Sequence, residues 1–112
     1  MVSSFLQGDI IYLDFDPQSG HEQRGRRPAV VVSNNVFNRF HNMRMVCPIT
    51  NTDRGIPFHV KLDDRTKTTG VILCDQARTL DLAARNAAYS ESLPPDLLAE
   101  VVDIIIGSIE IP

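Results

Sequence analysis

A histidine, a carboxylate and three arginines lie close together near the N-terminus, between positions 21 and 27: His21, Glu22, Arg24, Arg26 and Arg27. An Asp-Pro pair precedes them, which predicts a turn-rich loop between two strands. Loops held by a rigid scaffold are where binding and catalysis concentrate. Because such side chains can move a proton and hold a phosphate, this segment predicts phosphate chemistry that needs no metal ion.

Two further polar positions close predicted strands. Thr50 ends the run from Val46, and Asp75 with Gln76 ends the run from Val71. In a small barrel these strand ends can converge on one cleft with the loop 20–27. Phosphodiester cleavage by a neighbouring ribose 2′-hydroxyl needs such parts: a proton acceptor, a cation for the phosphorane and a hydrogen bond to a phosphate oxygen.

Each of these residues also has an ordinary structural interpretation. Taken alone, Glu22 is more often the partner of a surface ion pair, and His21 is more often a solvated loop histidine. The spacing of the loop residues therefore does not establish catalysis by itself.

The charge distribution is uneven, although the net charge is only −3. Residues 20–50 contain five arginines, two histidines and one acid, whereas residues 90–112 contain five acids and no Lys or Arg. Nine of the eleven basic residues are arginine, which suits bidentate contacts with phosphates or base edges. This pattern predicts one basic face for an anionic partner, and the alternative is chance clustering on a solvated surface.

The elements that must position these residues are mostly short strands. Apolar or alternating runs predict strands at 9–15, 29–33, 43–49, 58–62 and 70–75, and a helix starts near Pro95 and runs to Ile109. We therefore expect a mainly β single domain over residues 1–112, a small barrel or sandwich with a C-terminal helix. A second apolar stripe on that helix, at 98, 102, 106 and 109, predicts either a second subunit or complete burial.

The cysteines and the hydropathy of the chain indicate the cellular compartment and argue against a metal site. Cys47 and Cys74 lie inside apolar runs and are expected to be reduced and buried. Neither belongs to a CxxC pair, so we expect no zinc site and no other metal or cofactor. No apolar run is long enough for a membrane span, and the first residues lack a signal-peptide pattern. We expect a cytoplasmic protein.

An ordered set of motifs resembles the MazF/PemK/Kid family of toxins. The set runs almost the whole length of the chain: Gly8-Asp9-Ile10-Ile11, Phe15-Asp16-Pro17, Gly20-His21-Glu22-Gln23, Arg27-Pro28-Ala29-Val30-Val31, Pro48-Ile49-Thr50, Thr68-Thr69-Gly70-Val71 and Asp75-Gln76-Ala77-Arg78-Thr79-Leu80-Asp81. His21 and the segment 78–85 make the chain more similar to the Kid/PemK and ChpB branch.

The resemblance implies the toxin of a type II toxin–antitoxin pair. Such toxins are metal-independent endoribonucleases that cut single-stranded RNA, usually mRNA, and leave a 2′,3′-cyclic phosphate and a 5′-hydroxyl. The implied fold is an SH3-like β-barrel of about five to seven strands with a C-terminal helix. The implied assembly is a homodimer inhibited by a MazE/PemI-like antitoxin.

The resemblance also assigns catalytic residues. Arg27 matches the family's catalytic arginine and Thr50 its partner threonine, while Glu22, His21 and Asp75 are alternative proton-handling groups. Kid-like members carry an arginine two residues before the aspartate, where this chain has Leu73. We therefore favour the MazF-like pair of Arg27 and Thr50, and the proton acceptor stays open among the other three residues.

RNA contacts are expected from amides and guanidinium groups, which read base edges and stack on unpaired bases. The loop 51–56 and Asn35 belong to this prediction, together with Gln23, Arg24, Arg26, Asn34, Asn38, Arg39, Gln76 and Arg78. The alternative for the asparagines is a polar turn in which they serve as capping residues.

Two other functions compete with RNA cleavage. A CcdB-like toxin of the same fold would bind DNA gyrase without catalysis, but it would not need Arg27 and Thr50 beside the His21-Glu22-Gln23 loop. A degenerate toxin that binds RNA or antitoxin without cleaving is also consistent with Leu73.

Overall fold

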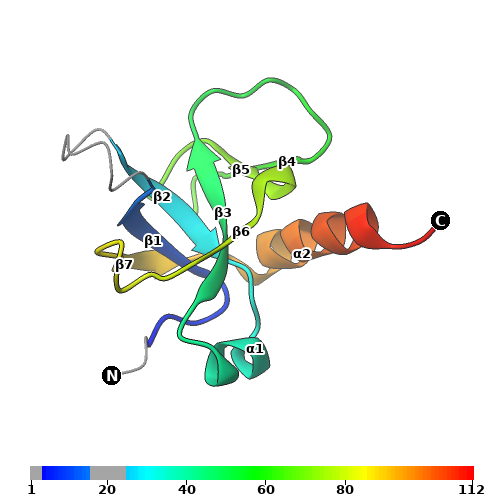
Figure 1. Ribbon diagram of the computed structural model, residues 1–112. Coiled ribbons are helices and arrows are strands. Elements are labelled where there is room, and N and C mark those ends of the chain that lie inside the picture. The colour runs from blue at the N-terminus through cyan, green and yellow to red at the C-terminus, as the bar shows by residue number, and fades with distance from the viewer. Residues whose placement is uncertain (1–3, 16–24) are drawn as a thin grey trace.

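The computed structural model describes residues 4–15 and 25–112, which form a curved antiparallel sheet with a helix against one side (Figure 1). The loop residues His21, Glu22, Gln23 and Arg24 lie outside the described ranges, so the predictions made for them remain predictions. In chain order the elements are β1 (Asp9–Asp14), β2 (Arg26–Val31), α1 (Asn35–Phe40), β3 (Arg44–Thr50), β4 (His59–Lys61), β5 (Val71–Leu73), the 3-10 helix η3 (Cys74–Gln76), β6 (Arg78–Leu80), β7 (Ala88–Ser92) and α2 (Pro95–Ile109).

The strand order is β4-β5-β3-β2-β1-β7, with β6 paired to β3 off this path. β3 therefore holds the sheet together, because β2 lies on one of its edges while β5 and β6 share its other edge in succession. The predicted mainly β fold with a C-terminal helix is confirmed. The barrel prediction needs one correction, because the sheet is not closed.

Period-two alternation divides the apolar side chains between two cores. Along β1, Ile10 packs into a core beneath α2, whereas Ile11 and Leu13 pack into a second core on the opposite face. All three side chains are fully buried, and each burial contributes roughly 1.5–3 kcal/mol. This alternation specifies the strand register, since a slip of one residue would turn each of these side chains away from the core it fills.

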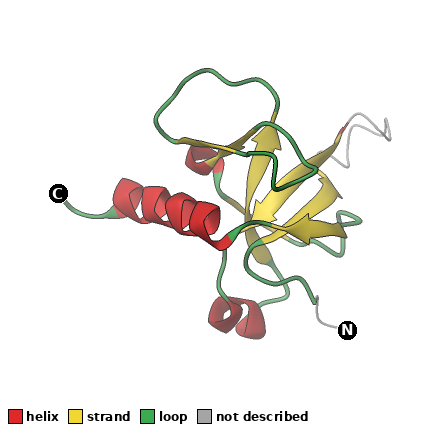
Figure 2. Cartoon of the chain, turned by 180° about the vertical axis from the view of Figure 1, so that it is seen from behind, coloured by secondary structure: helices red, strands yellow, loops and turns green. Residues whose placement is uncertain are grey.

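The C-terminal helix α2 begins at a proline, as predicted. Leu97 and Val101 are buried against the sheet, and Arg65 binds Asp96 in the first turn of the helix. The second apolar stripe is only partly covered, because the side chains of Ile106 and Ile109 are 47% and 76% exposed. Complete burial of this stripe is therefore wrong for its C-terminal half, which extends beyond the sheet (Figure 2).

Besides the 3-10 helix η3, three elements were not predicted. α1 has six residues, β6 has three with two of them exposed, and β7 is mostly polar. Segments this short or this polar carry no hydrophobic period, so only their tertiary partners reveal them.

Cys47 and Cys74 are free and buried as predicted, although Cys74 begins η3 rather than lying in a strand. No helix in the described ranges has the length and apolar character needed to cross a membrane.

Candidate active site

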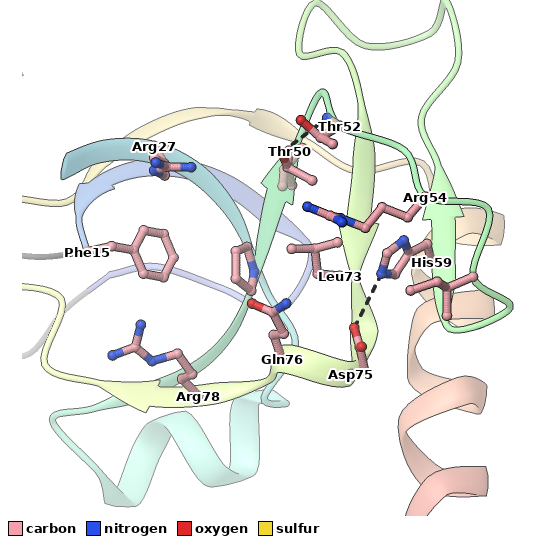
Figure 3. Close-up of a pocket in the computed structure, with 13 residues that line it drawn as sticks. Phe15, Arg27, Thr50, Thr52, Arg54, His59, Leu73, Asp75, Gln76 and Arg78 are labelled. Carbon is pink, nitrogen blue, oxygen red and sulfur yellow. Dashed lines mark hydrogen bonds and ion pairs between the residues drawn. The ribbon is translucent and has the colours of Figure 1, made fainter. Parts of the chain in front are cut away.

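A cavity of about 390 Å³ opens where the end of β3, the following loop, β4 and η3 meet (Figure 3). Its wall combines charged, polar and apolar side chains from segments far apart in the sequence. The lining residues are Phe15, Arg27, Pro48, Ile49, Thr50, Thr52, Arg54, Ile56, His59, Leu73, Asp75, Gln76 and Arg78. The predicted convergence of strand ends on one cleft is thus what the structure shows for Thr50, Asp75 and Gln76.

Arg27 and Thr50 face the cavity from neighbouring antiparallel strands. The register of β2 against β3 pairs Ala29 with Pro48. Extending this register by two residues toward the strand ends places Arg27 opposite Thr50. Residues opposite one another on antiparallel strands point to the same face of a sheet, so both side chains reach the same space.

Thr50 is held by its own turn and by the next strand. Its hydroxyl accepts a hydrogen bond from the backbone N–H of Thr52 at 3.2 Å, and its backbone pairs with Val71 of β5. Gly70, with φ +114°, lies so close that an added Cβ would overlap the carbonyl of Thr50. Only glycine permits this approach, so Gly70 fixes the backbone that carries Thr50.

Asp75 and His59 approach each other on the opposite side of the cavity. The Nε2 atom of His59 lies 3.5 Å from Oδ1 of Asp75, and the two side chains are 6% and 39% exposed. His59 was not singled out from the sequence, where it appears only as one residue of an alternating strand. Only the tertiary structure shows that His59 lines the cavity, because its position depends on how β4 pairs with β5.

An aromatic ring with an arginine above it forms a third wall. The guanidinium carbon of Arg78 lies 5.6 Å from the ring centroid of Phe15, within the range of a cation–π contact. Arg85 supports this arrangement by donating a hydrogen bond of 2.6 Å to the carbonyl of Phe15. Phe15 was not predicted as a site residue, whereas Arg78 was.

Positive charge dominates the described part of the cavity. Arg27, Arg54 and Arg78 line it against a single carboxylate, Asp75. Figure 3 shows the side chain of Arg54 extending into the cavity on the side of His59. The loop 51–56 was predicted to take part in binding, and it supplies Arg54 together with Thr52 and Ile56. Such an excess of guanidinium groups suits a phosphate-bearing ligand.

The two thiols lie behind this wall and are not nucleophiles. Burial, followed by the charges of nearby Cys74 and Asp75, raises the pKa of Cys47 to about 12. Burial and then Asp75 raise the pKa of Cys74 to about 11. Because the thiolate is the reactive form, both cysteines are inert at neutral pH.

The prediction that residues 20–50 form one basic face is wrong for the arginines that the structure describes. Only Arg27 among them lines the cavity. Arg44 is 2% exposed and donates to the carbonyls of Phe5, His41 and Met43. Arg26 binds Asp14 at 3.3 Å and the carbonyl of Asn86 at 2.9 Å. Residues adjacent in the sequence alternate between faces of the sheet, which scatters their charges.

The asparagines predicted to read RNA bases all have hydrogen-bond partners within the fold, and for the exposed Asn34 and Asn35 the contact with RNA stays a prediction. Asn34 caps α1 by accepting a hydrogen bond from the backbone N–H of Phe37. Asn38 is 4% exposed, and its amide exchanges two hydrogen bonds with Ser33, so its predicted base contact is wrong. Asn35 accepts a hydrogen bond from the backbone N–H of Gln7. Arg39 lies in the last turn of α1 and does not line the cavity.

With this geometry established, comparison with known proteins gives the family. A model of the PemK-like, MazF-like toxin of type II toxin-antitoxin systems matches residues 6–108. The chain belongs to this family. The resemblance predicted from the sequence motifs is thereby confirmed.

Individual members of the PemK/MazF family are similar over most of the chain. The endoribonuclease toxin ChpB of Escherichia coli (strain K12) is 42% identical over 93 residues, which cover 76% of this chain and 77% of ChpB. The endoribonuclease toxin MazF of the same strain is 37% identical over 112 residues, covering 96% of this chain and 100% of MazF. Both relatives are named endoribonucleases, which disfavours the CcdB-like alternative.

A solved structure shares the fold. In the crystal structure of MazE-MazF (Form-II) from Deinococcus radiodurans, the matching chain superposes with a TM-score of 0.81 at 31% sequence identity. The superposition covers 96% of this chain and 97% of that chain. The mainly β fold with its C-terminal helix is therefore shared with that chain.

Proposed function

We propose that this chain is an endoribonuclease toxin whose 112 residues form one domain, and that the cavity is its active site. The observation that carries the proposal is the placement of Arg27 opposite Thr50 on adjacent strands, at the mouth of an arginine-rich cavity. The relatives named above as endoribonucleases support the same activity for this chain. The expected substrate is single-stranded RNA, because unpaired bases can leave the stack and reach a cavity of this size.

The proposed reaction is transfer of a phosphodiester to the adjacent 2′-hydroxyl. The 2′-oxygen attacks phosphorus and loses its proton to a base, the bond to the 5′-oxygen breaks, and that oxygen takes up a proton. The products are a 2′,3′-cyclic phosphate and a 5′-hydroxyl. No metal ion is required by this scheme.

Arg27 stabilises the negative charge that builds on the phosphate oxygens, and Thr50 donates a hydrogen bond to one of them. Arginine stays protonated at neutral pH, so its contribution is electrostatic rather than proton transfer. Asp75 is the proposed base, and its position supports this role because its carboxylate lines the cavity. Glu22 and His21 remain alternatives outside the described ranges. Gln76, Arg78 and the loop 51–56 bind the flanking nucleotides.

The proposed partners follow from the family and from α2. A MazE/PemI-like antitoxin inhibits the toxin, as supported by the MazE-MazF complex of similar fold. A second copy of the chain covers the exposed apolar stripe at Ile106 and Ile109, which gives a homodimer. The proposed location is the cytoplasm, where the RNA substrate is found.

The test is incubation of the purified protein with a long single-stranded RNA in EDTA, with mapping of cleavage sites and end groups. Arg27→Ala should lower the cleavage rate by about 10²–10³-fold, the usual effect of losing one transition-state donor. The matched control is Arg39→Ala, which removes the same charge from α1, away from the cavity. Its cleavage rate should stay within about threefold of wild type.

Intact RNA after incubation with folded, antitoxin-free protein would contradict the proposal and favour a degenerate binder. Equal losses in Arg27→Ala and Arg39→Ala would show that general attraction to RNA, not the cavity, determines the rate. Cleavage that disappears in EDTA and returns with a divalent ion would refute the metal-independent chemistry.

A further inference from the structure

We propose that His59 is a positioning residue that orients Asp75 for proton abstraction from the RNA 2′-hydroxyl. The proposal rests on the RNA-cleaving function proposed above and deepens it. It concerns a buried imidazole that the sequence motifs left out and that the cavity brings against the carboxylate.

The backbone fixes the distance between these two residues. His59 pairs with Leu73 in the register of β4 against β5, and Asp75 follows Leu73 by two residues. The backbone N–H of Cys74 donates to the carbonyl of Phe58 at 3.1 Å, which ties the residue before Asp75 to the residue before His59. Nε2 of His59 consequently meets Oδ1 of Asp75 at 3.5 Å.

The other ring nitrogen shows that simple packing does not explain the imidazole. Nδ1 of His59 is buried without a hydrogen-bond partner among the described residues. An unsatisfied buried polar atom costs about 1–3 kcal/mol, and a leucine or phenylalanine would fill this position without that cost. Such an exception calls for a functional explanation, and the approach of Nε2 to Asp75 at 3.5 Å supplies it.

Nε2 restrains one oxygen of a carboxylate that is otherwise free to rotate. Asp75 is 39% exposed, so its side chain would sample several rotamers without a partner. In the neutral ring the proton belongs on Nε2, because Oδ1 of Asp75 is the acceptor that faces it. With Oδ1 held by His59, Oδ2 remains available to take the 2′-proton.

The neighbouring groups do not replace His59 in this role. Leu73 has no donor, and the guanidinium groups of Arg27, Arg54 and Arg78 stay charged and bind phosphate. An oriented base acts on the chemical step, so its misplacement lowers kcat much more than it raises KM. A misplacement of about 1 Å can cost about 100-fold in rate.

The experiment uses the intact protein and a short RNA that contains one mapped cleavage site. Steady-state kcat and KM are measured for His59→Phe, His59→Gln, Asp75→Asn and the double variant His59→Gln/Asp75→Asn. His59→Phe should lower kcat by about 10–100-fold with KM within about twofold of wild type. His59→Gln should recover part of kcat, because its amide N–H can still donate to Asp75.

The double variant distinguishes positioning from a separate contribution. If His59 acts through Asp75, the double variant should have the kcat of Asp75→Asn alone. The matched control is Lys61→Gln on the same strand, whose side chain is 77% exposed and does not line the cavity. It should leave kcat unchanged, and circular dichroism confirms that each variant is folded.

The outcomes separate the two proposals. Wild-type protein that leaves RNA intact overturns the function itself. Wild-type cleavage with an unchanged kcat in His59→Phe, no effect of Asp75→Asn, or losses that add in the double variant would each overturn the role of His59 alone. If His59→Phe does not fold, the cycle of His59→Gln with Asp75→Asn decides the question.

Discussion

Asn38 provides the sharpest contrast between an RNA-reading residue and a structural one. Its sequence context in the polar segment 34–39 favoured a contact with RNA bases, whereas its side chain is 4% exposed and turned toward Ser33. Replacing Asn38 with alanine should therefore destabilise the fold and leave the intrinsic affinity for RNA unchanged.

The magnitude follows from the hydrogen bonds that disappear. Nδ2 of Asn38 donates to the Ser33 carbonyl at 3.0 Å, and the Ser33 hydroxyl donates to Oδ1 of Asn38 at 2.6 Å. Ser33 is itself 6% exposed, so its carbonyl and the proton of its hydroxyl would lose Asn38 as a partner in a buried site, although the hydroxyl oxygen still accepts from the backbone N–H of Met45 at 3.0 Å. At roughly 1–3 kcal/mol for each unsatisfied group, partly relieved by relaxation, Asn38→Ala should cost about 2–4 kcal/mol.

The assay is urea unfolding followed by far-ultraviolet circular dichroism, since the chain contains no tryptophan. All variants are compared at one protein concentration, because dimerisation would make apparent stability depend on it. Asn34→Ala is the matched control: it removes the exposed cap of α1 and should cost about 1 kcal/mol. RNA affinity is measured under conditions where each variant is fully folded.

The result that would refute the reasoning is a loss of RNA affinity in Asn38→Ala with a free energy of unfolding within about 0.5 kcal/mol of wild type. That outcome would mean that Asn38 leaves its buried site to meet RNA. A loss of stability no larger than that of Asn34→Ala would show that the hydrogen bonds to Ser33 contribute little.

Gly70→Ala should place a methyl group against the Thr50 carbonyl at a position with positive φ. The free energy of unfolding should fall by at least about 1 kcal/mol, and RNA cleavage should slow; urea unfolding and the cleavage assay measure these two effects. Cys47, with its pKa raised to about 12, should resist iodoacetamide at about pH 8 until urea unfolds the protein. The unfolded thiol ionises from about pH 9 and the folded one only near 12, so the free energy of unfolding should fall as pH rises above 9.

Gly55→Ala is the matched control for Gly70, because it also has a positive φ but an added Cβ would meet no neighbour. Equal effects of the two glycine substitutions would show that backbone conformation, rather than contact with Thr50, is responsible. Rapid labelling of folded Cys47 would contradict the burial that raises its pKa.

Local sequence patterns predicted the elements that bury their own apolar residues. β1 follows from the β-branched and aromatic residues of 9–15, and α2 follows from Pro95, Asp96 and the apolar period after them. Arg27 and Thr50 also followed from the sequence, because their motifs match the family at the ends of predicted strands. These signals need only neighbouring residues, so no knowledge of the tertiary fold is required.

The sequence was misleading where it equated closeness along the chain with closeness in space. Arg26 and Arg27 are adjacent, yet Arg26 binds Asp14 while Arg27 faces the cavity. Adjacent strand residues point to opposite faces, so a basic run is not a basic surface. The true partners of Arg27 in the cavity, Arg54 and Arg78, come from a loop and a strand later in the chain.

Sequence alone thus determined the mainly β class, the family motifs and two candidates for catalysis. The tertiary structure alone decided that Asn38 is structural and that His59 meets Asp75. The pairing of His59 with Asp75 depends on the register of β4 against β5, and the burial of Asn38 depends on the packing of α1. Both are set by contacts between segments, which hydrophobic periodicity within one segment does not specify.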